Sequence, residues 1–199
     1  MVDPPRDPAS PPFRLLFICT ANRCRSPMAE FLARRSLARR QIDAEVVSSG
    51  RLESGVQASA GAVAAMAARE IDLRGHTSAR HDSETLAHAD LVLVMERTHL
   101  VDVYQAEPSA LDHSFTLGEF PVLLKTIEID PPIEADTTSL IRARGRIALA
   151  HRLRDPQRVL VDDDSTDIAD PMGRWNLHYR RTAKQIDRLI EESFDGLFC

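Results

Sequence analysis

The chain has 199 residues, of which 43% are hydrophobic and 28% are charged, and these proportions exclude a disordered polypeptide. Its 25 basic and 30 acidic residues give a net charge of −5, which argues against nonspecific nucleic-acid binding. No apolar run approaches the roughly 18 residues of a membrane span, and the N-terminal stretch lacks the basic start and apolar segment of a secretory signal. We therefore expect a soluble globular protein without a nucleic-acid partner or a membrane association.

The cysteines also indicate a compartment. There are three of them, Cys19, Cys24 and Cys199. An odd, low number in a chain without a secretory signal is typical of the reducing cytoplasm, where a cysteine is more often reactive than structural. We expect the protein to be cytoplasmic.

The first part of the chain predicts a tail, a strand and a helix. Five of the twelve prolines lie in residues 1–12, which predicts a flexible proline-rich tail. The nearly continuous apolar run Phe13–Ile18 is typical of a buried parallel strand. Ser26 as N-cap and Pro27 as first helical residue then predict a helix that reaches about Arg40.

Strands and helices alternate along the rest of the chain. Further strands are expected at Val46–Val47, Asp90–Met95 and Phe115–Leu117, and further helices at Ala58–Glu70 and from about Asn176 to Phe194. This alternation predicts an α/β fold of three layers, in which a short parallel sheet of about four strands carries helices on both faces.

One region fits this alternation less well. Residues 125–166 contain Pro131-Pro132, an arginine-rich helical piece at Leu140–Leu153 and the acidic run Asp162–Asp164. We interpret this region as an insertion within a single domain that spans residues 13–199. The acidic run is expected to be a solvated loop, with a metal site as the less favoured alternative.

The stretch between the first strand and its helix carries the chemistry. It reads Cys19-Thr20-Ala21-Asn22-Arg23-Cys24-Arg25-Ser26-Pro27. In an open parallel sheet, ligands bind in the crevice at the carboxyl end of a strand, and loop N–H groups together with a helix N-terminus form an anion site there. Such surroundings lower a thiol pKa from about 8.5 to roughly 3.5–7.5. The sequence therefore predicts Cys19 as a nucleophile.

Two neighbours of this cysteine complete the prediction. Arg25 offers a planar fork that can hold two phosphate oxygens at once, and Ser26 can donate a hydrogen bond to the thiolate. A nucleophile, an oxyanion clamp and an activating donor thus lie within eight residues. The loop has no glycine and no Gly-x4-Gly-Lys pattern, which excludes a nucleotide-binding Walker loop.

This stretch resembles the phosphate-binding loop of the low-molecular-weight protein tyrosine phosphatases, whose pattern is Cys-x-Gly-Asn-x-Cys-Arg-Ser-Pro. The resemblance continues through Met28-Ala29-Glu30, Ser48-Ser49-Gly50, Gly75-His76 and Ala89–Glu96, and it resumes at Asp170-Pro171. The proline tail and residues 125–166 lie outside it. The implied activity is phosphomonoester hydrolysis, chiefly of phosphotyrosine in a protein substrate, without a metal or other cofactor.

The resemblance implies a role for each loop residue. Cys19 would form a cysteinyl-phosphate, and Ser26 would stabilise its thiolate. Asn22 would hold the loop in a left-handed backbone conformation, which Asn tolerates well. The equatorial phosphate oxygens would be held by Arg25 and by the backbone of Thr20, Ala21, Asn22, Arg23 and Cys24.

Two residues outside the loop are implied as its hydrogen-bond partners. These are Ser48 and His76. Sequence alone leaves an alternative for each, namely a capped strand end for Ser48 and an ordinary packed histidine for His76.

The general acid needs a separate choice, because Asp-Pro occurs five times, at Asp3, Asp7, Asp130, Asp155 and Asp170. Asp170 directly precedes the terminal helix and follows Ile168-Ala169, where the resembled family carries its acid. A carboxylic acid there would protonate the leaving oxygen and then activate water. We expect Asp170 to be the acid, with Asp155 as the alternative.

Several residues depart from the family pattern. Ala21 replaces a glycine, and Met172 replaces an aromatic residue for which Trp175 could substitute. Arg23 takes the position that resembles a specificity switch, where apolar residues accompany phosphotyrosine activity and Thr accompanies phosphoarginine activity. Arg23 either lines the pocket mouth and favours acidic substrates or lies flat on the surface.

Cys24 also has two interpretations. In the resembled family this cysteine can trap the oxidised nucleophile as a disulfide, which implies a redox-sensitive enzyme. The alternative is an inert packed thiol.

Three other functions remain as alternatives. A phosphoarginine phosphatase would differ only in substrate. A non-catalytic module that binds phosphorylated ligands is compatible with the departures from the pattern. An arsenate reductase is disfavoured, because it needs further resolving cysteines and the sequence has none between Cys24 and Cys199.

Overall fold

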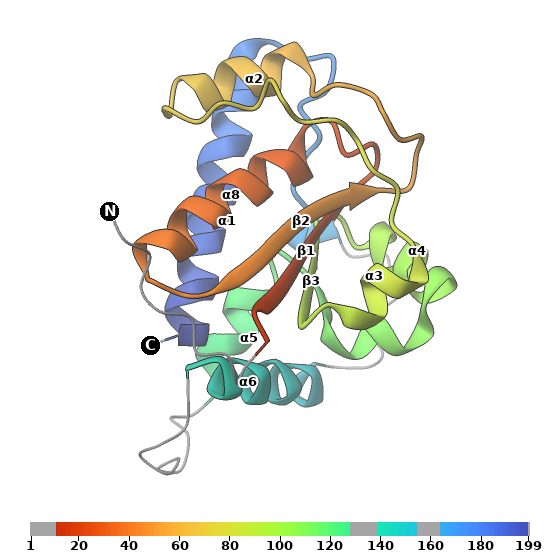
Figure 1. The fold of residues 1–199 in the computed structure, drawn as a ribbon, viewed down its shortest axis with the longest axis vertical. Helices are drawn as coiled ribbons and strands as arrows, with labels where there is room; N and C mark the ends of the chain where they lie inside the picture. The colour runs from red at the N-terminus through yellow and green to blue at the C-terminus, as the bar shows by residue number, and fades with distance from the viewer. Residues whose placement is uncertain (1–10, 128–138, 155–163, 199) are drawn as a thin grey trace.

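The computed structural model describes residues 11–127, 139–154 and 164–198. Its centre is a sheet of four parallel strands in the order β2-β1-β3-β4 (Figure 1). The strands are β1 (Phe13–Cys19), β2 (Ala44–Gly50), β3 (Leu91–Val94) and β4 (Ser114–Thr116). The predicted α/β fold with a short parallel sheet of four strands is therefore confirmed.

The apolar run of β1 reflects burial on both faces of the sheet. Leu15 and Phe17 belong to a large hydrophobic cluster, whereas Leu16 and Ile18 belong to a second, smaller one. A strand that is covered on both sides needs apolar residues at successive positions, which removes the alternation of a half-exposed strand.

Helices cover both faces. The large cluster contains residues of α1 (Arg25–Arg39), α2 (Ala60–Ala67), α5 (Phe120–Thr126) and α8 (Asn176–Phe198), and α8 runs along the length of the sheet (Figure 1). The smaller cluster contains residues of α3 (Ser83–His88), α4 (Thr98–Ala106) and the short 3-10 helix η1 (Pro108–His113). A second short 3-10 helix, η2, spans Asp164–Thr166.

Helix α6 (Ser139–Leu153) lies in the predicted insertion and matches its expected helical piece. It crosses one end of the sheet (Figure 1). The opposite end carries residues 19–26, the candidate for a phosphate-binding loop, called the phosphate-loop candidate below. At the end crossed by α6, Arg144 forms a two-pronged ion pair with Asp90, at 2.7 and 3.1 Å, and Asp90 also accepts a hydrogen bond from the backbone N–H of Arg14. The proline tail up to residue 10 and the acidic residues Asp162 and Asp163 lie outside the described residues.

The start of α1 differs from the prediction. The helix begins at Arg25, with Cys24 as N-cap and no side-chain cap, so Ser26 is not the N-cap and Pro27 is not the first helical residue. The hydroxyl of Ser26 is engaged elsewhere, as described below. Pro27 still lies in the first turn, where a missing N–H leaves no helical hydrogen bond unmade.

The order of the strands determines where a ligand fits. From β1 the chain crosses one face of the sheet through α1 to β2, and it later reaches β3, on the other side of β1, after α3 on the opposite face. The carboxyl ends of β1 and β3 therefore form a switch point, the place where open parallel sheets bind ligands. β2 ends there in Gly50, where a Cβ atom would lie 2.8 Å from the backbone nitrogen of Asn22. A glycine is therefore required for the loop to pack against β2. Among the described residues, no helix is long and apolar enough to cross a bilayer.

Candidate active site

The candidate nucleophile lies at the carboxyl end of β1. Cys19 is the last residue of the strand, and its side chain is buried at the base of the loop that follows. The hydroxyl of Ser26 lies 3.1 Å from the Cys19 sulfur and 3.2 Å from the carbonyl oxygen of Ser49. Ser26 is thus placed to donate a hydrogen bond to a thiolate on Cys19.

Asn22 organises the loop. Its φ of 51° is left-handed, as the family resemblance implied for this position. The side-chain amide donates to the hydroxyls of Ser26 at 2.9 Å and Ser48 at 2.8 Å, and its oxygen accepts from the backbone N–H of Ala79 at 2.8 Å. The amide therefore connects the loop to β2 and to the segment before α3.

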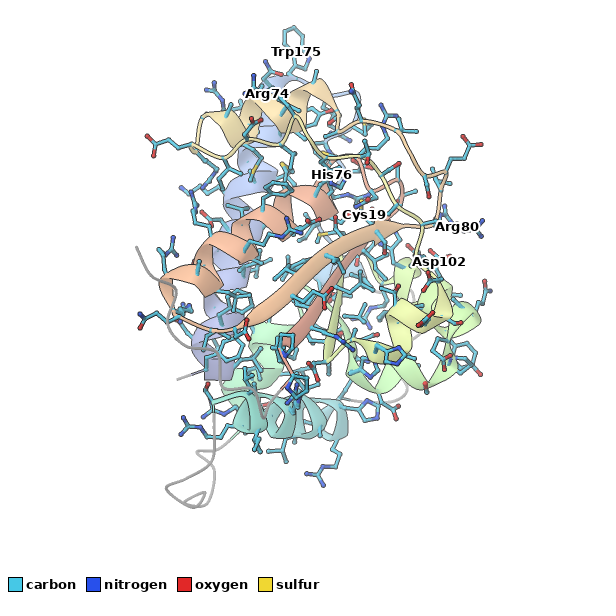
Figure 2. All side chains as sticks on the ribbon, viewed as in Figure 1. Cys19, Arg74, His76, Arg80, Asp102 and Trp175 are labelled. Atoms are coloured by element: carbon cyan, nitrogen blue, oxygen red, sulfur yellow. The ribbon has the colours of Figure 1, made fainter. Side chains whose placement is uncertain are left out.

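Ser48 and His76, the two expected partners outside the loop, both contact Asn22. The Nε2 of His76 lies 2.9 Å from the carbonyl oxygen of Asn22, and Ser48 donates its own proton to Glu30. Glu30 in turn pairs with Arg34 at 2.6 Å. Figure 2 shows where His76 and Cys19 lie in the molecule.

Arg25 is almost completely buried, with 1% of its surface exposed. Its Nη1 donates to Glu96 and to the carbonyl oxygen of Ile168, while its Nη2 donates to Asp170 at 3.0 Å. Burial lowers the pKa of the guanidinium, but the hydrogen bond to Glu96 and the charges of Asp170 and Cys19 raise it more, so the pKa lies above its ordinary value. Arg25 is a permanent positive charge held against the loop.

The Nε of Arg25 is buried and has no hydrogen-bond partner among the described residues. Nη1 is held by Glu96 and Ile168, and Nη2 contacts Asp170 and, more weakly, Thr20, so a ligand at the edge formed by Nε and Nη2 would bind the unpartnered Nε and share Nη2 with these residues. Two parallel N–H groups on one edge match two oxygens of a phosphate.

Asp170 reaches the site from the loop before α8. One carboxylate oxygen accepts from Arg25 Nη2, and the other accepts from the backbone N–H of Met172 at 2.9 Å. The alternative acid, Asp155, and the three other Asp-Pro aspartates, Asp3, Asp7 and Asp130, lie outside the described residues.

Arg23 lies along the rim of the loop. Its Nε donates to the carbonyl oxygen of Gln57 at 3.2 Å, and its own carbonyl oxygen accepts from the N–H of Ser59 at 2.8 Å. The side chain is half-buried against the segment that leads to α2. Ala21, next to Asn22, has no positive φ, so its methyl group is compatible with the loop backbone.

Cys24 is buried beside the nucleophile. Burial, together with the negative charge of Asp170 and of Cys19, raises the pKa of its thiol to about 12. Cys24 therefore stays protonated at neutral pH. Both described cysteines are free thiols, and Cys199 lies outside the described residues.

Trp175, the possible replacement for the aromatic residue expected at position 172, does not face the candidate acid. Trp175 is 84% exposed and projects from the tip of the molecule (Figure 2). Met172 instead contacts Tyr179, whose hydroxyl lies 3.8 Å from the thioether sulfur.

Sequence reasoning assigned no role to two residues that follow β3. Glu96 pairs with Arg25, and His99 lies 3.0 Å from the hydroxyl of Thr20. A signal for both was present, because polar residues that directly follow a buried strand lie at the ligand-binding edge of a parallel sheet. Arg25 holds the pKa of Glu96 below its ordinary value, although partial burial acts in the opposite direction.

In the part of the chain that the structure describes, the side chains that commonly bind metal ions form no cluster. No group of three or more His, Cys, Asp or Glu side chains is placed there to hold a metal ion. The charges that converge on the loop are those of protein side chains, above all Arg25.

Comparison with known proteins agrees with this geometry. The family model described as low molecular weight phosphotyrosine protein phosphatase matches residues 14–154. The probable low molecular weight protein-tyrosine-phosphatase EpsP of Ralstonia nicotianae is 32% identical over 146 residues, which cover 70% of this chain and 95% of that protein. A protein-arginine-phosphatase of Geobacillus stearothermophilus is 34% identical over 110 residues, covering 55% of this chain and 72% of the relative.

Solved structures agree as well. The crystal structure of a low molecular weight protein tyrosine phosphatase from T. tengcongensis superposes with a TM-score of 0.67 at 26% sequence identity, covering 92% of this chain and 98% of that one. The family match ends before Asp170, so the candidate acid stands on its contact with Arg25 and not on the match. The chain belongs to the low molecular weight phosphotyrosine protein phosphatase family.

Proposed function

We propose that the protein hydrolyses phosphotyrosine in protein substrates through a cysteinyl-phosphate on Cys19. The observation that carries this proposal is the convergence of four side chains, those of Cys19, Arg25, Ser26 and Asp170, at one edge of the sheet. Ser26 contacts the sulfur of Cys19 at 3.1 Å, and Arg25, the residue before it, contacts Asp170 at 3.0 Å. Nucleophile, anion clamp and proton donor are thereby joined by two contacts.

In the first step the Cys19 thiolate attacks phosphorus, and the bond between phosphorus and the phenolic oxygen breaks. Asp170, in its protonated form, gives its proton to that oxygen as it leaves. The phosphoryl oxygens lie against the loop N–H groups and the edge of Arg25 formed by Nε and Nη2, where buried donors stabilise the charge that develops. The product tyrosine departs, and phosphorus remains bonded to sulfur.

In the second step water attacks the cysteinyl-phosphate. Asp170, now a carboxylate, takes a proton from that water, the sulfur–phosphorus bond breaks, and inorganic phosphate leaves with Cys19 again a thiolate. Ser26 assists both steps, because a hydrogen bond to the sulfur stabilises the thiolate as nucleophile and as leaving group.

Phosphoarginine is the second candidate substrate, because relatives at 34–36% identity are protein-arginine-phosphatases. Arg23 favours phosphotyrosine over it. A cation at the loop rim can face an aromatic ring, whereas it repels the guanidinium of phosphoarginine. Arg23 would at the same time attract acidic residues that flank the phosphotyrosine.

Two finer features belong to the same proposal. A thiolate nucleophile requires reducing surroundings, so the proposed enzyme works in the cytoplasm. Cys24 is proposed to capture an oxidised Cys19 as a disulfide, which makes the enzyme redox-sensitive.

A substrate panel tests the proposal. Purified protein is assayed on para-nitrophenyl phosphate and on peptides that carry phosphotyrosine, phosphoserine or phosphoarginine, with and without EDTA. We expect turnover of the aryl phosphate and the phosphotyrosine peptide that EDTA leaves intact and that Cys19→Ser abolishes. Activity lost with EDTA and restored by a divalent cation contradicts the mechanism, preference for phosphoarginine contradicts the substrate, and no turnover at all favours a binding module.

A further inference from the structure

We propose that His99 is a positioning residue that turns the hydroxyl of Thr20 into a hydrogen-bond donor for the bound phosphoryl group. The inference rests on the proposed function, because it requires a phosphoryl group against Arg25. It concerns a histidine on α4 and a loop residue whose backbone alone had been assigned to phosphate binding.

The protonation of His99 follows from its two contacts. The backbone N–H of Glu96 lies 3.1 Å from Nδ1 of the imidazole. A peptide N–H can only donate, so Nδ1 must be the unprotonated, accepting nitrogen. The other ring nitrogen, Nε2, therefore carries the proton.

This assignment agrees with the surroundings of the ring. His99 is 2% exposed, and burial lowers its pKa to about 4, with the charges of Arg25 and Arg51 acting in the same direction and that of Glu96 against it. At neutral pH the imidazole is uncharged and has one N–H. That N–H points at Thr20, whose hydroxyl oxygen lies 3.0 Å from Nε2.

The Thr20 hydroxyl thus acts as an acceptor toward the protein. It accepts from Nε2 of His99 and, more weakly at 3.4 Å, from Nη2 of Arg25. A hydroxyl has two acceptor positions and one proton to donate. With both acceptor positions used, the proton has to be donated in a further direction.

The position of Arg25 indicates that direction. The nitrogen that contacts Thr20 is the same Nη2 that contacts Asp170, and it lies on one edge of the guanidinium together with the unpartnered Nε. Thr20 is only half-buried and directly follows Cys19. A phosphoryl oxygen held at this edge is within reach of the Thr20 hydroxyl, which then supplies one donor beyond the loop backbone and Arg25.

Two matched pairs of variants separate this role from simple packing. Thr20→Ser keeps the hydroxyl, whereas Thr20→Val keeps the shape and removes it. His99→Gln places an amide N–H near the position of Nε2, whereas His99→Asn places its amide near the position of Nδ1 and leaves Thr20 without its donor. The double variant Thr20→Val/His99→Asn measures whether the two residues act as one unit.

The readout is the dissociation constant for inorganic phosphate, measured by calorimetry, together with kcat on para-nitrophenyl phosphate. A hydrogen bond to a charged group is worth about ten- to a hundredfold in affinity, so we expect a loss of that size in Thr20→Val and near-parental binding in Thr20→Ser. His99→Asn should lose about three- to tenfold and His99→Gln less, since the hydroxyl remains and only its orientation is relaxed. The double variant should bind like Thr20→Val alone.

Several results overturn the inference. These are unchanged phosphate affinity in Thr20→Val, equal impairment of Thr20→Ser, or losses that multiply in the double variant. A raised pKa of Cys19 in Thr20→Val with unchanged phosphate affinity, read from the pH dependence of alkylation by iodoacetate, means that the hydroxyl donates to sulfur instead.

Two further outcomes distinguish a failure of the proposed function from a failure of the role proposed for Thr20 and His99. If the parent enzyme itself binds no phosphate, the proposed function is wrong and not only the role of Thr20. If His99→Asn does not fold, the Thr20 pair, which leaves the imidazole in place, and His99→Gln, which keeps an N–H near the position of Nε2, still decide the question.

Discussion

Arg25 and Asp170 form an ion pair with 3.0 Å between Nη2 and Oδ2, although 145 positions separate them in the chain. Arg25 opens the first helix after the phosphate-loop candidate, and Asp170 lies in the last loop before α8. The contact brings the proposed anion clamp and the proposed acid to one place, and a phosphoryl group bound at the edge of Arg25 formed by Nε and Nη2 would lie next to the Asp170 carboxyl. Several expected outcomes depend on this arrangement.

The first concerns the acid. Asp170→Asn should lower turnover of substrates with poor leaving groups by about 10²–10⁴-fold, because the leaving oxygen then departs without a proton. Phosphorylation of Cys19 by an ester of a very acidic phenol should be much less affected. A series of aryl phosphates assayed in both proteins measures this difference. As a control, Asp195→Asn removes one carboxylate at the far end of α8 and should change none of these rates; a loss that does not depend on the leaving group contradicts the assignment.

The second concerns Arg23, which is anchored to the carbonyl oxygen of Gln57 at the loop rim. One exposed charge is worth up to about 1 kcal/mol and is screened by salt. Arg23→Ile should therefore keep turnover of small aryl phosphates and weaken, a fewfold at most, peptides with acidic residues beside the phosphotyrosine.

The control for Arg23 removes the same charge at the opposite end of β1, in Arg14→Ile. We expect that variant to treat acidic and neutral peptides alike. A uniform loss in Arg23→Ile on every substrate, independent of salt, would mean that Arg23 clamps the phosphate itself.

The third concerns oxidation. Peroxide converts the Cys19 thiolate to a sulfenic acid, and attack by Cys24 on that sulfur forms the disulfide and releases water. Because burial raises the pKa of Cys24 to about 12, its reactive thiolate is scarce at neutral pH and should become more abundant as pH rises. The fraction of activity that a thiol reductant restores after mild peroxide should therefore increase from about pH 7 to about pH 9. Cys24→Ser should show low recovery at both values; equal recovery in the two proteins would mean that Cys24 only packs.

The fourth concerns the stability of the fold in acid. His99 has a folded pKa of about 4, below the 6.5 of a free histidine, because burial and the nearby charges of Arg25 and Arg51 disfavour its protonated form more than Glu96 favours it. A depressed histidine pKa means that the unfolded chain takes up the proton first, so the stabilisation is complete above about pH 6.5 and is lost as pH falls toward 4. The lost free energy is about 3 kcal/mol.

Urea unfolding at several pH values measures that loss. Going from about pH 7 to pH 4.5, the parent should lose more of its free energy of unfolding than His99→Asn, which lacks the buried imidazole. The acidic groups common to both proteins cancel in this comparison. Parallel pH profiles would contradict a buried, neutral imidazole.

Some elements of the fold can be predicted from the sequence and others cannot. The parallel sheet was predictable, because the doubly covered strands β1 and β3 leave continuous apolar runs. The start of α1 was not, because Ser26 resembles an N-cap locally while its hydroxyl contacts Cys19, and only the folded loop shows that choice. The short helices α3, α4 and α5 were also not predicted, since a few residues give too little periodicity.

The candidate site likewise contains residues that the sequence predicts and residues that only the fold brings together. Cys19, Arg25 and Ser26 lie within eight residues and could be proposed from local chemistry. Glu96, which is 71 positions from Arg25, and His99, which is 79 positions from Thr20, become neighbours only because β3 lies next to β1 in the sheet. Sequence order alone does not specify such contacts.

The central claim is that phosphorus passes through the sulfur of Cys19, and trapping the intermediate tests it most directly. Asp170→Asn is mixed with para-nitrophenyl phosphate, quenched in acid within the first turnovers, digested and examined by mass spectrometry. Since the variant can expel an acidic phenol but lacks the base that activates water, we predict about one phosphoryl group per active site, carried by Cys19, and a matching burst of nitrophenolate. Product formation with no burst and no phosphoryl group on Cys19, or with the group on another residue, would contradict the account.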